Sequence, residues 1–294
     1  MTVLDAPEAH EPVGSGGGNP ALTRSAGRGT ATAGQRLGAA SGIGLGMAVI
    51  WLSLLVLLPL AAIATKAFSG GWSQFWDAVS TPANWRVLEF TVGCSVIVTV
   101  INAVMGTLIA WVLVRDKFRG KRVLDFVIDI PFALPTIVAG LVLLAVYGPN
   151  SPVGIDLLGT RRAIVIALLF VTLPFVVRTV QPVLEALDTE SEQAARCLGA
   201  GPWTTFRRII LPLLLPAIGS GAALAFARAM GEYGSMLLIS GGRTQTTVAS
   251  VLIFQKYENF DYVGAAAVAT VLLFVSLVVI VLLDVLQRRA ARRG

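Results

Sequence analysis

The chain has 294 residues, of which 55% are hydrophobic and only 14% are charged, and its mean hydropathy is +0.76. A soluble domain would carry about a quarter charged residues, so lipid is the main solvent that this composition indicates. The net charge of +6 does not indicate a nucleic-acid binder, because the basic residues stand in short blocks between long apolar runs. Cys94, Cys197 and His10 form no disulfide framework, metal-ligand spacing or catalytic cluster, so we expect no catalytic residue, metal or bound cofactor.

The chain begins with a polar tail and continues as a series of apolar runs. Residues 1–38 are rich in Gly, Ala, Ser and Pro without apolar periodicity, which predicts a disordered cytoplasmic tail. Each of the six runs that follow is near the roughly 20 residues that cross a bilayer, and backbone in lipid must satisfy its own hydrogen bonds. We therefore expect an all-α polytopic membrane protein. Its six transmembrane helices should cover residues 43–65, 90–114, 124–147, 163–183, 214–240 and 262–283.

The basic residues predict how these spans are oriented. Fifteen Lys and Arg residues fall in the tail, in the loops after the second and fourth spans and at the C-terminus, against six in the other loops. By the positive-inside rule, both termini face the cytoplasm. The expected layout is the tail over 1–38, a six-helix membrane domain over 39–288 with a cytoplasmic loop over 186–212, and a basic cytoplasmic end over 289–294.

The loop between the fourth and fifth spans contains EQAARCLGAGPWTTFRRIILP, the most informative polar segment of the chain. Thr189 and Glu192 have the spacing of a capping box, and Pro202 suits the first position of a second helix. Gly199 lies between them and permits a tight turn. The loop is therefore expected to be a helix–turn–helix at the cytoplasmic surface. It either docks into a groove on another protein or lies among lipid headgroups as an amphipathic linker.

The same loop resembles a motif of importer permeases of the ATP-binding cassette (ABC) class, which reads EAA, three residues, Gly, nine residues, Ile, one residue, Leu-Pro. The chain departs from it at one position, where Gln replaces the usual Glu, although Glu192 stands just before. The resemblance implies a type I (MetI-like) permease fold and identifies the loop as a coupling helix that docks on a cytoplasmic ATPase subunit. The candidate coupling residues are Glu192, Gln193, Ala194, Ala195, Gly199, Ile209, Leu211 and Pro212.

The resemblance also implies the other components of the transporter. They are two copies of an ATPase subunit that uses ATP and Mg²⁺, a second homologous permease and an extracytoplasmic protein that binds the cargo. The chain has no GxxxxGK[ST] motif of its own, so hydrolysis must belong to a separate subunit.

Three further segments narrow the resemblance, which covers about residues 40–290. LSLLVLLPLAAIATKAF, DFVIDIPFALPTIVAGLVL and FARAMGEYGSMLLISGG resemble the T subunits of sulfate/thiosulfate importers (CysT-like). Molybdate/tungstate permeases have a related GEFGAT-like sequence in the last segment. Molybdate or tungstate is therefore the nearest alternative cargo. An alternative of another class is a secondary anion transporter, against which the docking motif argues. A membrane enzyme is disfavoured, because the acidic residues are scattered and no histidine lies in a span.

Polar residues at membrane depth suggest a solute path. Asp129, Arg178, Arg228 and Glu232 are costly in lipid unless they are paired or hydrated. Arg228 and Glu232 are four residues apart and can pair on one helix face, so they form either a structural ion pair or part of the path. Thr136 and Ser235 could offer weak donors to an anion, or simply serve helix packing.

Overall fold

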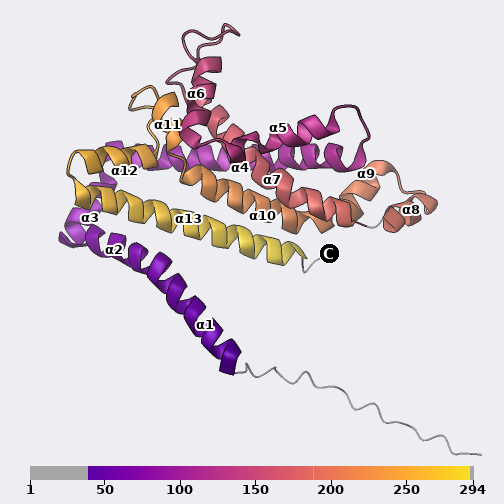
Figure 1. The fold of residues 1–294 in the computed structure, drawn as a ribbon, viewed down its shortest axis with the longest axis horizontal. Coiled ribbons are helices and arrows are strands. Elements are labelled where there is room, and N and C mark those ends of the chain that lie inside the picture. Colours follow the sequence, from indigo (N-terminus) through magenta and orange to yellow (C-terminus); the bar gives the residue numbers. More distant parts are fainter. Residues whose placement is uncertain (1–38, 188, 292–294) are drawn as a thin grey trace, which may run out of the picture. The chain divides into compact units, whose positions relative to one another are not determined.

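The computed structural model describes residues 39–187 and 189–291, whose regular structure is entirely helical. The chain divides into two units, Met1–Trp51 and Leu52–Gly294. The described part of the first unit lies within α1 (Ala39–Leu52). The other helices are α2 (Leu58–Ala67), α3 (Gly71–Ser80), α4 (Pro82–Arg115), α5 (Lys121–Ala133), α6 (Thr136–Tyr147), α7 (Arg161–Ala186), α8 (Thr189–Cys197), α9 (Pro202–Thr205), α10 (Leu211–Met230), α11 (Gly234–Ile239), α12 (Ala249–Glu258) and α13 (Tyr262–Ala291), with π-helical turns η1 (Ser53–Leu57) and η2 (Phe206–Ile210) (Figure 1). The expected tail over 1–38 and the last residues, 292–294, lie outside the described residues.

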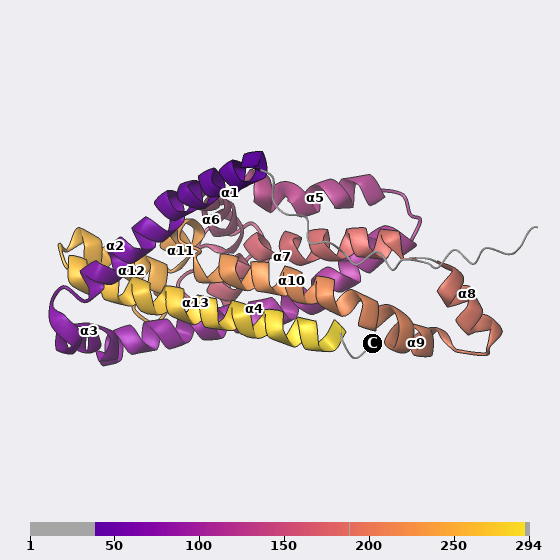
Figure 2. The ribbon, with the colours of Figure 1, turned by 90° about the horizontal axis from the view of Figure 1, so that it is seen from below.

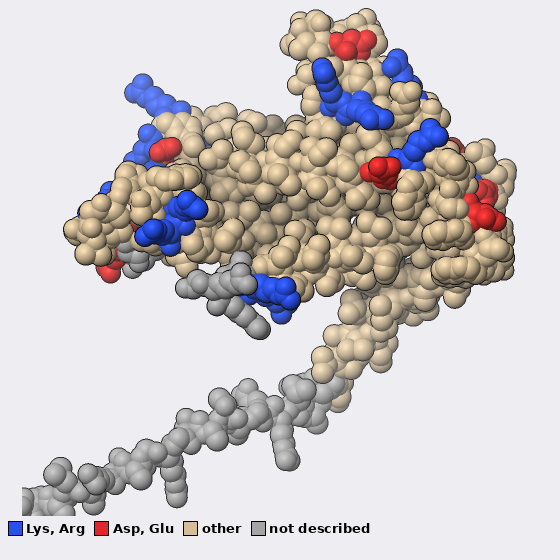
Figure 3. Space-filling model, turned by 180° about the vertical axis from the view of Figure 1, so that it is seen from behind, with Lys and Arg blue, Asp and Glu red and all other residues tan. Residues whose placement is uncertain are grey.

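Five helical stretches are long and apolar enough to cross a membrane, which confirms the all-helical membrane fold. They are Ile43–Ala67, Pro82–Arg115, Arg161–Ala186, Pro202–Met230 and Tyr262–Arg289. Figure 3 shows wide uncharged stretches of one face between groups of charged side chains. A surface in contact with lipid requires such stretches, because an unpaired charge there is costly.

The third expected span, residues 124–147, is not one straight helix. The chain bends by 117° between α5 and α6, so this segment is either a broken span or a re-entrant loop. The break lies at Leu134 and Pro135, where Leu134 is extended with φ −86° and ψ 133°. A residue before proline is pushed out of the helical region, and proline has no N–H to continue the helix. Pro135 therefore explains the bend.

The fifth span begins and ends earlier in the sequence than the expected range, residues 214–240. The helix runs from Pro202 through η2 into α10 and ends at Met230. Pro202 is in its first turn, as predicted. Gly231 caps α10, and a new short helix, α11, begins at Gly234. The segment GEYGS therefore marks a helix break, and not the interior of a span.

The core of the second unit forms where α7 packs between α4 and α10. A Cβ atom placed on Gly106 of α4 would lie 2.8 Å from the Cβ of Val176. One placed on Gly221 of α10 would lie 2.9 Å from the Cα of the same valine. Val176 of α7 is fully buried. Small residues allow membrane helices to approach closely where no hydrophobic effect drives them together. These two glycines therefore set the spacing of the three helices.

We expect Gly221→Leu to lower the free energy of unfolding by about 1–3 kcal/mol, because the added side chain meets the backbone of α7. Thermal unfolding of the purified protein in detergent measures this change. Gly93→Leu in α4 is the matched control, since no atom outside its own turn lies within 4 Å of the position where its Cβ would stand. Equal unfolding temperatures for the two variants would contradict the packing role of Gly221.

Candidate functional site

The loop after α7 is anchored to the end of α4 by an ion pair. Glu192 of α8 accepts a hydrogen bond from Arg115, the last residue of α4, at 2.5 Å, and both side chains are largely buried. A basic side chain is also favourable at a helix C-terminus. Glu192, one of the expected coupling residues, is therefore engaged within its own chain. No local pattern predicts this pair, because 77 positions separate the two residues.

Aromatic side chains extend this anchor to the helix that follows the loop. The Arg115 guanidinium lies 5.6 Å from the centre of the Trp111 ring, a cation–π arrangement. Trp111 meets Phe206 edge to face, with ring centres 5.4 Å apart, and Phe206 stacks on Trp203 at 5.7 Å. The start of the Pro202–Met230 helix is thereby tied to the end of α4.

Gly199 ends α8 in the turn that the sequence predicts. Its φ is +80°, a conformation that strains any residue with a Cβ. The N–H of Gly199 donates to the carbonyl of Arg196 at 2.9 Å, and the N–H of Ala200 donates to that of Ala195 at 3.0 Å. This pair of bonds is a Schellman motif, which satisfies the last carbonyls of α8. The predicted capping side chain of Thr189 lies outside the described residues.

The turn presents an apolar outer face. Leu198 is 89% exposed and Trp203 is 70% exposed, and Gln193 and Ala194 are exposed beside them, whereas Ala195 faces inward. Figures 1 and 2 place α8 and α9 at one end of the second unit and α3 at the other. Ile209, Leu211 and Pro212 lie in the long helix beyond Trp203. The face that a partner could reach is therefore formed by Gln193, Ala194, Leu198 and Trp203.

Arg178 holds α5 against α7. Its guanidinium donates two hydrogen bonds to the carboxylate of Asp129, at 2.7 and 2.6 Å. It donates two more to Asp125, at 2.7 Å to the carboxylate and 2.9 Å to the carbonyl, and one to Gln181 at 2.7 Å. Five donors thus meet five acceptors, which leaves no free N–H for a passing anion. Asp129 and Arg178, expected at membrane depth, are paired, and Asp125 is the partner that sequence reasoning missed.

Glu232 forms the second charged centre. Its side chain is fully buried and lies 2.6 Å from Arg228, so the expected pair exists. The other carboxylate oxygen accepts hydrogen bonds from the N–H and hydroxyl of Ser235, at 3.0 and 2.8 Å. The carbonyl of Glu232 accepts one from the Ser250 hydroxyl at 2.5 Å. Glu232 thus connects α10, α11 and α12, which favours the structural interpretation of the pair.

Thr136 and Ser235 lie where α6 and α11 approach each other. A Cβ on Gly234 would meet the Thr136 hydroxyl at 2.3 Å, and one on Gly140 would meet the Ser235 Cα at 2.8 Å. Ser235 is fully buried and bonded to Glu232. These residues belong to a tight contact between α6 and α11.

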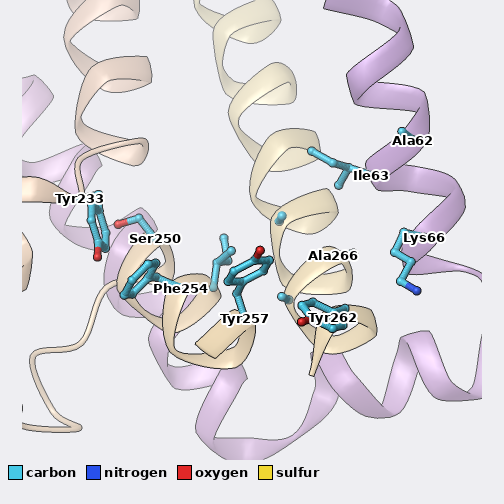
Figure 4. A pocket seen from close by; sticks show the side chains of 12 residues that line it. Ala62, Ile63, Lys66, Tyr233, Ser250, Phe254, Tyr257, Tyr262 and Ala266 are labelled. Atoms are coloured by element: carbon cyan, nitrogen blue, oxygen red, sulfur yellow. The ribbon is translucent and has the colours of Figure 1, made fainter. Parts of the chain in front are cut away.

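A cavity of about 790 Å³ lies between α2, α12 and α13 (Figure 4). Its wall is mostly hydrocarbon and includes the aromatic rings of Tyr233, Phe254, Tyr257 and Tyr262. A desolvated anion would find few donors there, and apolar surroundings penalise its charge. The chemistry of this cavity therefore suits an apolar group better than an inorganic ion.

Known proteins resemble the chain over most of its length. Residues 102–293 match the family described as binding-protein-dependent transport system inner membrane component. The probable sulfate transport system permease protein cysT of Nephroselmis olivacea is 42% identical over 249 residues, which cover 82% of this chain and 88% of that protein. The sulfate transport system permease protein CysT of Salmonella typhimurium is 40% identical over 259 residues, covering 85% and 94%.

A solved structure shares the fold. A chain in the crystal structure of a bacterial alginate ABC transporter, in complex with an alginate pentasaccharide-bound periplasmic protein, matches with a TM-score of 0.72 and 16% identity. The match covers 85% of this chain and 94% of that one. At this identity the likeness concerns the fold alone.

We expect Glu232→Gln to lower the free energy of unfolding by about 1–3 kcal/mol, because it removes the charge that pairs with Arg228 and strengthens the bonds from Ser235, which together join α10 to α11. Thermal unfolding in detergent is the measurement. Asp284→Asn is the matched control, since it breaks another i,i+4 pair, with Arg288, that is exposed and contributes little. Lost transport at unchanged stability would instead favour a role for Glu232 in the path.

Proposed function

The chain belongs to the family of inner-membrane components of binding-protein-dependent transport systems, and from this membership we propose that it is the T-type permease subunit of a bacterial sulfate importer. As the permease component of an ABC transporter, it leaves ATP hydrolysis to a separate subunit. The proposed cargo is sulfate, with thiosulfate as a second substrate. Molybdate is the competing oxyanion.

The observation that carries the cargo proposal is the extent of the likeness to sulfate permeases. The relatives are 40–42% identical over 82–85% of this chain, and they carry sulfate transport in their names. The segment GEYGS lies within the matched region and forms the α10–α11 break with Glu232 at its centre. The cargo proposal therefore rests on the extent of the identity to these permeases.

The proposed assembly contains two copies of the ATPase subunit, a second homologous permease of the W type and an extracytoplasmic sulfate-binding protein. The chain sits in the cytoplasmic membrane with both termini in the cytoplasm, as its basic residues predict. Its permease domain covers residues 39–288, with the coupling loop over 186–212. The ion pair between Arg115 and Glu192 supports this orientation, because it brings the end of α4, which precedes one basic loop, together with the α8–α9 loop.

The α8–α9 loop is the proposed contact with the ATPase. Leu198 and Trp203 expose apolar surface at the end of the molecule that faces the cytoplasm in this proposal, and their backbone is fixed by the Schellman turn and the Arg115 anchor. A rigid, apolar projection suits insertion into a groove on a partner. Of the proposed coupling residues, Gln193 and Ala194 share this face, and Glu192 and Gly199 hold it in shape.

The proposed cycle follows from this contact. Closure of the ATPase pair on ATP would draw the two docked loops together. The continuous helix from Pro202 to Met230 would carry that movement into the membrane domain. The cavity between the two permeases would then open outward and receive the anion, and hydrolysis would reset it.

Uptake of radiolabelled sulfate by cells with and without this protein tests the cargo. We expect uptake to depend on the protein and to fall when unlabelled thiosulfate is added, while equimolar molybdate competes weakly. Sulfate uptake that does not change when the protein is removed would overturn the proposal. Protein-dependent uptake of molybdate, without uptake of sulfate, would show that the chain belongs to a molybdate importer.

Leu198→Asp tests the docking loop. Because this side chain is 89% exposed, the change should leave folding intact and yet place a charge in the ATPase groove. We expect binding-protein-stimulated ATP hydrolysis in the reconstituted complex to fall roughly tenfold or more. Phe118→Asp, on an exposed ring between α4 and α5, is the matched control and should retain activity. Normal coupling by Leu198→Asp would exclude this face as the contact.

A further inference from the structure

A second cavity, of about 490 Å³, lies away from the α8–α9 loop. Its chemistry differs from that of the cavity between α2, α12 and α13. Polar and apolar surface share its wall, which includes two arginines, whereas the wall of the first cavity is mostly hydrocarbon. It combines residues from the start of α4, the start of α7, the segment before α12, and α12 itself. Its polar lining includes Asn84, Arg86, Arg161, Thr244, Gln245 and Gln255.

The N-terminal ends of three helices meet at this cavity. Ala83 and Asn84 belong to the first turn of α4, Arg161 is the first residue of α7, and Thr247 precedes the cap of α12. Helices of 34, 26 and 10 residues thus begin beside one space, where the hydroxyls of Thr160 and Thr91 already accept the N–H groups of Ala163 and Ala249. Backbone N–H groups and aligned peptide dipoles make such ends favourable for anions.

Two arginines add full positive charge to this space. Among the residues that the structure describes, no carboxylate lines the cavity, and neither Arg86 nor Arg161 forms an ion pair. The Arg161 guanidinium lies 5.6 Å from the centre of the Phe90 ring, which orients it without using its hydrogen-bond donors. Both groups therefore retain donors for a ligand.

Lys256 lies next to the cavity in the sequence and, unlike Arg86 and Arg161, forms an ion pair among the described residues. Lys256 follows the lining residue Gln255 and donates to Asp261 at 2.8 Å. The hydrogen bond from Lys256 lowers the pKa of the Asp261 carboxyl, so this pair stays ionised and mutually neutralised over the physiological range. The charge of Lys256 is thus offset by Asp261, whereas Arg86 and Arg161, which line the cavity, form no ion pair among the described residues.

We propose that this cavity is a low-affinity binding site for a small tetrahedral oxyanion of the sulfate class, at the extracytoplasmic mouth of the permease. For its side of the membrane and its ligand, the inference rests on the proposed function. Guanidinium groups bind such oxygens with paired hydrogen bonds, and Gln245, Gln255 and Thr244 line the same space with amides and a hydroxyl. Exposure of both arginines to solvent keeps the affinity modest, and a site on a transport route must also release its ion.

Direct binding tests this site without transport. The complex of this chain with its second permease and ATPase subunits is placed in nanodiscs, without binding protein, and titrated with radiolabelled sulfate at low ionic strength. We expect saturable binding that Arg86→Gln and Arg161→Gln each weaken roughly tenfold. Arg162→Gln, which removes the adjacent charge outside the lining, should bind as the unmodified complex does. Equal unfolding temperatures of all four proteins verify that the fold is intact.

The possible results separate the site from the cargo. Unchanged sulfate binding in Arg86→Gln and Arg161→Gln overturns the site and leaves the sulfate importer standing. Unchanged sulfate binding together with weaker docking of the liganded binding protein also overturns it, and assigns the arginines to acidic side chains of that partner. Arginine-dependent sulfate binding by a complex that fails to import sulfate supports the site and rejects the cargo.

Discussion

The buried carboxylate of Glu232 is the constraint on which the arrangement of the helices depends. A fully buried charge is tolerated only when it is paired and hydrogen-bonded, and here Arg228 and Ser235 supply the partners. Those partners fix where α10 ends and where α11 begins. The carbonyl of the same residue holds Ser250, and the Thr91 hydroxyl accepts the N–H of Ala249 at 2.8 Å, so the start of α12 is set against α4. The basic cavity lies at that junction.

The two ends of the second unit are connected by one helix. It begins at Pro202 in the α8–α9 loop and ends at Met230, two positions before Glu232. At the loop end it is held by the stacked rings of Trp203, Phe206 and Trp111. A displacement of the loop therefore acts on a rigid element whose far end is bonded to α11 and α12. This connection gives the proposed coupling a physical route that needs no contact between the ATPase and the anion.

Local rules were sufficient for several elements of the chain. Hydropathy located the spans, Pro202 and Gly199 marked the start of one helix and the end of another, and the four-residue spacing of Arg228 and Glu232 predicted their pair. The bend at Pro135 was within reach of the same rules, but the apolar run across it suggested one straight helix. The pairs Arg115–Glu192 and Arg178–Asp125 were not within reach, because they join positions 77 and 53 residues apart. The basic cavity is of the same kind, since tertiary packing alone brings Arg86, Arg161 and Gln245 together.

The distribution of neutralised and unneutralised charge suits an anion importer. At membrane depth, Arg178 is matched by two aspartates and Arg228 by Glu232, so neither offers an isolated positive charge that would hold a dianion. At the mouth, Arg86 and Arg161 face no carboxylate in the lining of their cavity. An attractive field at the entrance raises the local anion concentration, while a strong site deeper inside would slow release. In the proposed transporter, Arg86 and Arg161 line the cavity where an anion would be collected and form no ion pair among the described residues, whereas Arg178 and Arg228 are paired within helices long and apolar enough to cross the membrane.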